Sequence, residues 1–151
     1  MLAYKELVRC ELLVLGAKRR DEGAMAELVG IFERPLVYYL RRLVASEADA
    51  WDLLQETWLH VFRSIRTIRD GRAFPAFLYR TARNAALMHL RKRKAHEALL
   101  SAVDPPVQEP ATGTNIRADE AQAVHGALGS LSIVHREVLT LFFLRLHELR
   151  E

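Results

Sequence analysis

Apolar residues recur along this chain at intervals of three and four positions, the spacing that is typical of amphipathic helices. One such stripe consists of Leu54, Trp58, Val61, Phe62 and Ile65, and we expect it to face the core. No segment sustains the alternation of period two that marks a half-buried strand, and no Asn-Gly or Asp-Gly pair joins two β-branched runs. The pattern therefore predicts an all-α fold.

Capping residues and prolines divide the pattern into separate helices. Ser46, with Asp49 three positions later, fits a capping box that opens a helix. Pro35 is expected to kink the helix that contains it or to begin its second half, whereas Pro75 occupies a first-turn position that tolerates proline. The stretch "SAVDPPVQEPATGTN" has no helical periodicity and is predicted to be a linker. The predicted helices cover residues 2–19, 22–45, 46–68, 74 into the "RKRK" run, and 116–151.

The composition excludes several classes of protein. The single cysteine, Cys10, allows no internal disulfide and no CxxC zinc site, so a reduced, cytoplasmic setting is expected. No apolar run is long enough to cross a bilayer, and the N-terminal residues read as a first helix instead of a signal peptide. We find no GxxxxGK[ST], GxSxG or HExxH motif, and we expect neither enzymatic activity nor a metal or other cofactor.

Charge is distributed very unevenly along the chain. Residues 1–62 hold 8 Lys/Arg and 10 Asp/Glu, residues 63–96 hold 10 Lys/Arg and one acid, and residues 97–151 hold 4 Lys/Arg and 8 acids. A short basic block inside a nearly neutral chain is the electrostatic footprint of a surface that binds nucleic acid. A basic face that is merely solvated would give the same count, so charge alone leaves both interpretations open.

The basic block coincides with the stretch "FPAFLYRTARNAALMHLRKRK", which begins at residue 74. On a helical wheel Phe77, Arg80, Asn84 and Arg91 fall within about 60° of one another. The residues on the far side are Leu78, Ala82, Ala85 and Ala86. Alanines permit close helix packing on their side, so the other side is predicted to face outward. There a phenylalanine ring can stack on a base, an asparagine can bond a base edge, and arginines can bind phosphates. The alternative is that Phe77 belongs to the core and that Asn84 is solvated.

The preceding helix, "EADAWDLLQETWLHVF", has the opposite character and contains no lysine or arginine. Asp52, Gln55, Glu56 and Leu59 share one face at i, i+3, i+4 and i+7. An acidic face with one apolar residue suits docking on a basic partner helix. A solvated acidic face remains the alternative for this segment by itself. We interpret Trp51 and Tyr79 as core residues.

The two helices together resemble region two of bacterial sigma factors, in the extracytoplasmic-function (ECF) group of the sigma-70 family. That family carries an Asp-x-x-Asp-Leu-x-Gln-Glu-x-Phe helix, followed by Phe-x-x-Trp-Leu-Tyr-x-Ile-Ala-x-Asn and a basic tail. The resemblance spans roughly residues 15–98. The positions that match are Asp49, Asp52, Leu53, Gln55, Glu56, Phe74, Leu78, Tyr79, Ala82 and Asn84.

The resemblance implies two binding surfaces. In the family the acidic helix docks on the β′ clamp helices of core RNA polymerase, which predicts a polymerase-binding set of Asp49, Asp52, Leu53, Gln55, Glu56 and Leu59. The next helix and the loop 68–73 take the melted minus-ten promoter element and hold a flipped-out base, with Asn84 at the pocket and Phe77 where tryptophan is usual. The predicted DNA-binding set is Arg69, Phe74, Phe77, Arg80, Arg83, Asn84, Arg91, Lys92, Arg93 and Lys94. An anti-sigma factor is the further partner that the resemblance implies.

The C-terminal stretch "GALGSLSIVHREVLTLFFLRLHELRE" resembles the beginning of sigma region four, whose first core positions would be Val138, Leu139, Leu141 and Phe142. The chain stops where a recognition helix would follow, so reading of the minus-thirty-five element is not expected. The predicted organisation is region two in residues 1–98, a linker in 99–116 and an incomplete region four in 117–151.

Two other functions remain open on the sequence. One is a basic helical module that binds nucleic acid without polymerase. The other is a truncated sigma factor that occupies polymerase or an anti-sigma factor without starting transcription. The acidic face discriminates the first from a sigma factor, because only a sigma factor needs Asp52 and Glu56.

Overall fold

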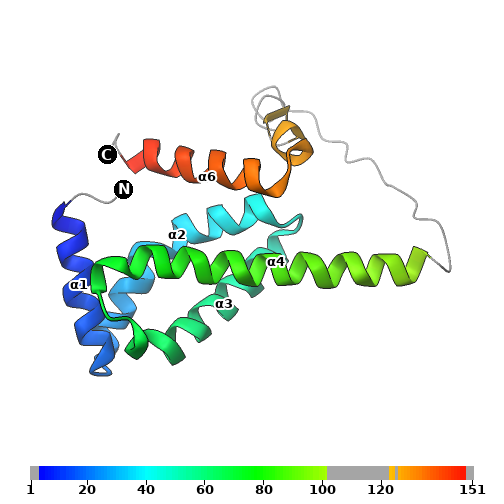
Figure 1. Ribbon diagram of the computed structural model, residues 1–151. Coiled ribbons are helices and arrows are strands. Elements are labelled where there is room, and N and C mark those ends of the chain that lie inside the picture. The colour runs from blue at the N-terminus through cyan, green and yellow to red at the C-terminus, as the bar shows by residue number, and fades with distance from the viewer. Residues whose placement is uncertain (1–3, 102–122, 125, 149–151) are drawn as a thin grey trace.

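The computed structural model describes residues 4–101, 123–124 and 126–148, and within these ranges the chain forms helices and turns without a strand. The predicted all-α fold is therefore confirmed (Figure 1). The elements are α1 (Tyr4–Lys18), α2 (Glu22–Leu43), α3 (Glu47–Ser64), the 3₁₀ turns η1 (Ile65–Thr67) and η2 (Gly71–Ala73), α4 (Phe74–Ser101) and α6 (Ile133–Glu148).

Helix starts follow the capping residues in the sequence. The Asp21 carboxylate accepts hydrogen bonds from the amides of Gly23 and Ala24, which opens α2. Ser46 Oγ accepts the amide of Asp49 at 3.0 Å, so the predicted start of α3 is confirmed. α2 continues through Pro35 as one helix, and α3 ends at Ser64, earlier than the pattern predicts.

α2 is the central helix of the bundle and contacts α1, α3, α4 and α6. Its buried stripe includes Phe32, Leu36 and Leu40, which are at most 4% exposed. The alanine side of α4 packs inward as predicted, since Ala82 and Ala86 are both 0% exposed. Small side chains there let α4 approach the other helices closely, which leaves its opposite side to solvent.

The loop between α3 and α4 is fixed onto α1. A Cβ atom added to Gly71 would come within 2.8 Å of Glu11 Cα, so only glycine allows this close approach. Arg72 Nε donates to Glu11 Oε2 at 2.9 Å, and Lys18 Nζ donates to the carbonyl oxygen of Ile68. The loop that precedes α4 is therefore held in a defined position before any ligand binds.

The C-terminal part differs from the prediction of one helical region over residues 116–151. Residues 126–130 are helical, the helix is interrupted at Leu131 and Ser132, and α6 follows. Ser132 Oγ lies 2.7 Å from His135 Nδ1, and the Ser132 carbonyl accepts the Arg136 amide. The turn between the two helical pieces lets α6 fold back along α2 (Figure 1).

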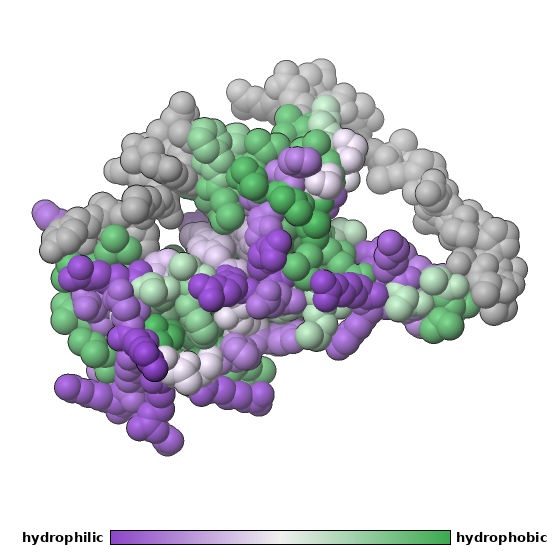
Figure 2. All heavy atoms as spheres, in the orientation of Figure 1, coloured by the Kyte–Doolittle hydropathy of each residue, from purple (hydrophilic) through white to green (hydrophobic). Residues whose placement is uncertain are grey.

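The predicted core positions of this segment are wrong. Val138, Leu139, Leu141 and Phe142 are 60%, 46%, 39% and 57% exposed, because α6 turns another face toward the bundle. Figure 2 shows hydrophobic residues gathered over α6. Within residues 133–144, Ile133, Thr140 and Leu144 are among the residues that pack inward.

Candidate functional site

The outward side of α4 presents polar and basic side chains as the helical wheel predicts. Arg80 and Asn84 are exposed, and every residue in 91–100 is exposed as well. α4 therefore projects beyond the helices that pack against its first half (Figure 1). Arg93 pairs with Glu97 at 2.8 Å along this projecting part. We call the surface formed by Arg80, Asn84 and residues 91–94 the basic face.

The two phenylalanines of the predicted DNA-binding set are not free on this surface. Phe74 is 0% exposed and meets the ring of Phe32 edge-on at a centroid distance of 5.6 Å. The prediction that Phe74 contacts DNA is wrong, because a DNA strand cannot reach a ring that is buried in the core. Phe77 is half-buried and packs against the core, so only part of its ring is open to a base.

Arg83 lies beside the basic face and is already paired. Its Nε donates to Glu137 Oε2 at 2.7 Å, and the Tyr39 hydroxyl donates to Glu137 Oε1 at 2.7 Å. The hydrogen bond and charge of Glu137 raise the pKa of Arg83, and burial together with the bond to Glu137 raises the pKa of Tyr39. The sequence offers no sign of Glu137, because this residue is distant from both partners along the chain. Arg69, the remaining predicted DNA contact, is exposed in the loop before α4.

The outer side of α3 carries the predicted acidic face. Asp52, Gln55, Glu56 and Leu59 are all exposed on it. Leu53 is 3% exposed, so the prediction that it contacts polymerase is wrong. The reason is that α3 packs against both α2 and α4, which buries more than one stripe of its surface.

Asp49 has a different environment from the rest of the acidic face. Its carboxylate lies 3.4 Å from His89 Nε2 on α4, and both side chains are 30% exposed. The ring nitrogen makes no aligned hydrogen bond, so the two groups are close in space but are not hydrogen-bonded. Asp49 joins α3 to α4 and is less open to a partner than Asp52 or Glu56.

Two aromatic residues on α3 are more exposed than the sequence predicts. Trp51 is 43% exposed and Phe62 is 50% exposed, so both predictions of a core position are wrong. Together with Gln55 and Leu59 they follow the spacing i, i+4, i+8 and i+11, which is one stripe of a helix. The spacing was present in the sequence and could have revealed them. We call Trp51, Asp52, Gln55, Glu56, Leu59 and Phe62 the α3 outer face.

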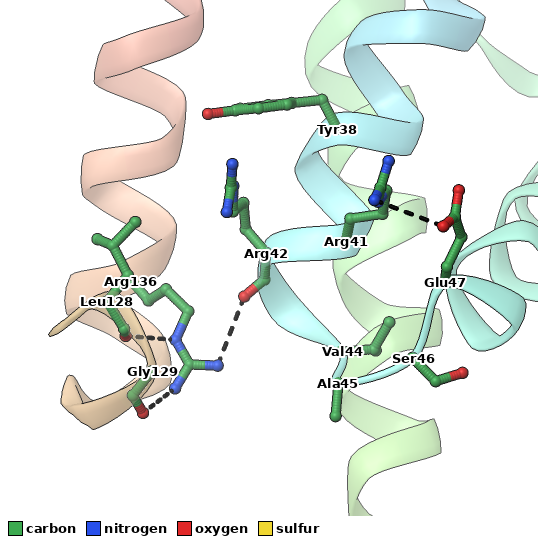
Figure 3. Close-up of a pocket in the computed structure, with 10 residues that line it drawn as sticks. All are labelled: Tyr38, Arg41, Arg42, Val44, Ala45, Ser46, Glu47, Leu128, Gly129 and Arg136. Atoms are coloured by element: carbon green, nitrogen blue, oxygen red, sulfur yellow. Dashed lines mark hydrogen bonds and ion pairs between the residues drawn. The ribbon is translucent and has the colours of Figure 1, made fainter. Parts of the chain in front are cut away.

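A cavity of about 810 Å³ lies where the end of α2 meets the segment before α6 (Figure 3). Arg42 lies over the ring of Tyr38 at 4.7 Å, and Arg41 pairs with Glu47 at 3.5 Å. Arg136 donates to the carbonyl oxygens of Leu128 and Gly129, so its guanidinium closes the turn that leads into α6.

The described residues hold no group of three or more His, Cys, Asp or Glu side chains placed to bind a metal ion. Cys10 is buried, and that burial raises the pKa of its thiol. Within the same ranges, no helix has both the length and the apolar composition that crossing a membrane requires.

Comparison with known proteins supports the resemblance seen in the motifs. A family model described as "Sigma-70 region 2" matches residues 28–96. The chain is 34% identical over 129 residues to RNA polymerase sigma factor CarQ of Myxococcus xanthus, which covers 82% of this chain and 73% of CarQ. It is 29% identical over 77 residues to ECF RNA polymerase sigma factor SigW of Bacillus subtilis, which covers 51% of this chain and 41% of SigW.

A third relative is ECF RNA polymerase sigma factor SigF of Caulobacter vibrioides, which is 32% identical over 94 residues, or 60% of this chain and 51% of SigF. The chain thus spans about half the length of several curated relatives that it matches, or less. Because the match to CarQ covers most of both chains, the relationship extends beyond one short motif. The chain belongs to the sigma-70 family of RNA polymerase sigma factors, in its ECF group.

Proposed function

We propose that this protein binds core RNA polymerase through the α3 outer face and captures the melted minus-ten promoter element on the basic face of α4. In this role it directs transcription initiation in the cytoplasm and does no chemistry itself, since polymerase supplies catalysis. The observation that carries the proposal is that one bundle exposes an acidic-aromatic surface on α3 and a basic surface on α4. The names of the related proteins, which are RNA polymerase sigma factors, support it.

The basic face has the groups that unpaired DNA requires. Asn84 is exposed on the first half of α4, and its amide has donors and acceptors for a base edge. Arg80 and the run Arg91–Lys94 supply cations for phosphates along the same side. Flipping a base out of the stack costs a few kcal/mol, and stacking on an aromatic ring returns roughly 1–3 kcal/mol per base. Because the ring of Phe77 is half-buried, we expect its stacking energy to lie toward the lower end of that range.

The α3 outer face has the chemistry of a protein interface. Trp51, Leu59 and Phe62 supply apolar area, and Asp52 and Glu56 supply charge at its edge. Aromatic side chains are enriched among residues that dominate binding energy, whereas acids at a rim mainly set orientation and association rate. A basic, partly apolar helix is the partner that fits this surface, and the β′ clamp helices are that partner in the family.

The division of the chain is part of the proposal. Residues 1–98 would form region two, 99–116 the linker and 117–151 the beginning of region four. α4 itself continues to Ser101. We also propose that an anti-sigma factor regulates the protein, as is usual for its family. Reading of the minus-thirty-five element is not part of this proposal.

The first experiment is co-elution of the chain with core RNA polymerase on size exclusion. The test variant, Asp52→Asn/Glu56→Gln, removes two negative charges from the α3 outer face. The control, Glu22→Gln/Glu33→Gln, removes two charges from α2. We expect the parent and the control to co-elute with polymerase at moderate salt, and the test variant to elute separately from it. Equal retention of both variants would contradict docking through α3.

Run-off transcription then separates initiation from occupancy. A promoter with a minus-ten element should give a transcript with the parent and polymerase. If the chain binds polymerase but yields no transcript, it acts as a decoy. If it binds nucleic acid but not polymerase, it is an independent nucleic-acid-binding module.

A further inference from the structure

The side of α6 that faces the bundle carries Glu137 among apolar and small polar residues. Ile133, Glu137, Thr140 and Leu144 follow the spacing i, i+4, i+7 and i+11, which puts them on one side of the helix. Ile133 and Leu144 pack against the core, and Thr140 is 4% exposed. The Glu137 side chain is 13% exposed, which is unusual for a carboxylate.

Two hydrogen bonds compensate the burial of Glu137, and they come from different helices. Tyr39 on α2 donates to one carboxylate oxygen, and Arg83 on α4 donates to the other. A buried charge that loses its partners is strongly unfavourable, so Glu137 is stable either with both partners or in water. α6 is therefore expected to dock or to leave as a unit.

A second anchor reinforces the docked position. Arg136, next to Glu137, donates to the carbonyl oxygens of Leu128, Gly129 and Leu131, and its Nη1 also lies 3.4 Å from the carbonyl oxygen of Arg42 at the end of α2. Figure 3 shows the Arg136 guanidinium between the segment before α6 and α2. The turn into α6 and the inner face of α6 are thus both tied to α2.

The docked state alters the charge of the DNA-binding side of α4. Arg83 belongs to the predicted DNA-binding set, and its guanidinium is 39% exposed while it is bonded to Glu137. A phosphate could reach Arg83 only in competition with a carboxylate of the same chain. The carboxylate also adds a fixed negative charge beside the basic face, which opposes the approach of a nucleic acid strand.

We propose that α6 is an intramolecular latch, and that breaking the contact of Glu137 with Tyr39 and Arg83 converts the chain from a state of low affinity for single-stranded DNA to one of high affinity. This inference rests on the proposed function, because it requires that α4 binds DNA. The apparent dissociation constant then equals the intrinsic one divided by the fraction of open molecules. Any change that opens the latch strengthens binding until the open state predominates.

The test measures the latch and DNA binding separately. Hydrogen exchange of the amides in residues 133–144 reports whether α6 is docked. Fluorescence anisotropy with a labelled single-stranded oligonucleotide that contains a minus-ten element reports affinity at fixed salt. Tyr39→Phe is the main variant, because it removes the hydroxyl that bonds Glu137 and changes no charge. Glu137→Gln is the second.

Glu97→Gln is the matched control. Glu97 also pairs with an arginine of α4, at 2.8 Å from Arg93, but it takes no part in the docking of α6. Its removal reports the effect of one lost negative charge near the basic face. The parent chain is measured beside all three variants.

We expect Tyr39→Phe to lower the protection of residues 133–144 and to tighten DNA binding by about tenfold or more. Tenfold is the lower end of the factor that a lost hydrogen bond to a charged group would give if the closed state predominates. Glu137→Gln should tighten binding more than Glu97→Gln does. The latch is refuted if the protection of residues 133–144 does not change in either variant. It is also refuted if protection falls but DNA affinity does not follow, so that Tyr39→Phe binds DNA like the parent and Glu137→Gln binds it like Glu97→Gln. Absence of DNA binding in the parent and all variants would instead show that the proposed function is wrong. The latch proposal would then be refuted as well, because it requires that α4 binds DNA.

Discussion

Replacement of Phe74 by alanine is expected to destabilise the whole helical bundle, and not to remove a local contact with DNA. The side chain is 0% exposed at the start of α4, and its ring packs at 62° to the ring of Phe32 on α2. Truncation would leave a cavity between the two helices, because the rigid elements around it close only in part.

The size of the effect follows from this environment. Replacement of a buried phenylalanine by alanine costs about 3–5 kcal/mol, and the edge-on aromatic pair accounts for roughly 0.5–1.5 kcal/mol of such a loss. Small domains are stable by only about 5–15 kcal/mol. Phe74→Ala should therefore lose a large fraction of the free energy of unfolding.

Urea denaturation followed by far-UV circular dichroism measures this change. Phe62→Ala is the matched control, because Phe62 is 50% exposed on the α3 outer face. Its free energy of unfolding should stay within about 1 kcal/mol of the parent's. The reasoning would be refuted if Phe74→Ala unfolded at the same urea concentration as the parent but bound single-stranded DNA less tightly. That result would mean that the ring is open to DNA.

Four further changes have distinct expected outcomes. Asn84→Ala should weaken binding to single strands with a minus-ten element more than to arbitrary strands, and equal losses in an anisotropy titration would contradict base reading. Lys92→Ala should weaken all strands similarly and lower the slope of log affinity against log salt by about one; an unchanged slope would exclude a phosphate contact. Gly71→Ala should destabilise the chain by about 1–3 kcal/mol in thermal or urea unfolding, because its Cβ would come within 2.8 Å of Glu11 Cα. Gly30→Ala, where a Cβ meets nothing within 4 Å, should stabilise α2 by roughly 0.5–1 kcal/mol, and equal effects of the two changes would contradict the close packing at Gly71.

Local features of the sequence predicted the helices well. Ser46 caps α3 as expected, and Ala82 and Ala86 face the core as expected. These outcomes depend on interactions within a few residues, such as a side chain bonded to an amide three positions away. The motifs also predicted the family, and the comparisons with known sigma factors confirm it.

The errors concern which side of a helix meets another helix. A helical wheel gives the angle between side chains of one helix but not the number or position of its neighbours. α3 packs against two helices, and Leu53 is buried in consequence while Phe62 is exposed. For Phe74 a signal existed, since it precedes the buried Leu78 by four residues. The resemblance to the family had suggested a DNA contact in its place.

The amino-acid sequence by itself determined the helical class, most helix boundaries, the basic and acidic segments and the family, because each depends on local spacing or on matched motifs. Only the tertiary structure decided that Glu137 meets Arg83 and Tyr39, which are 54 and 98 positions away. It also decided that α6 turns Ile133 and Leu144 inward and Val138 and Phe142 outward. A helix that is apolar on more than one side has several faces it could bury. The face that is buried here carries Glu137, and its two partners are brought together only when the chain folds.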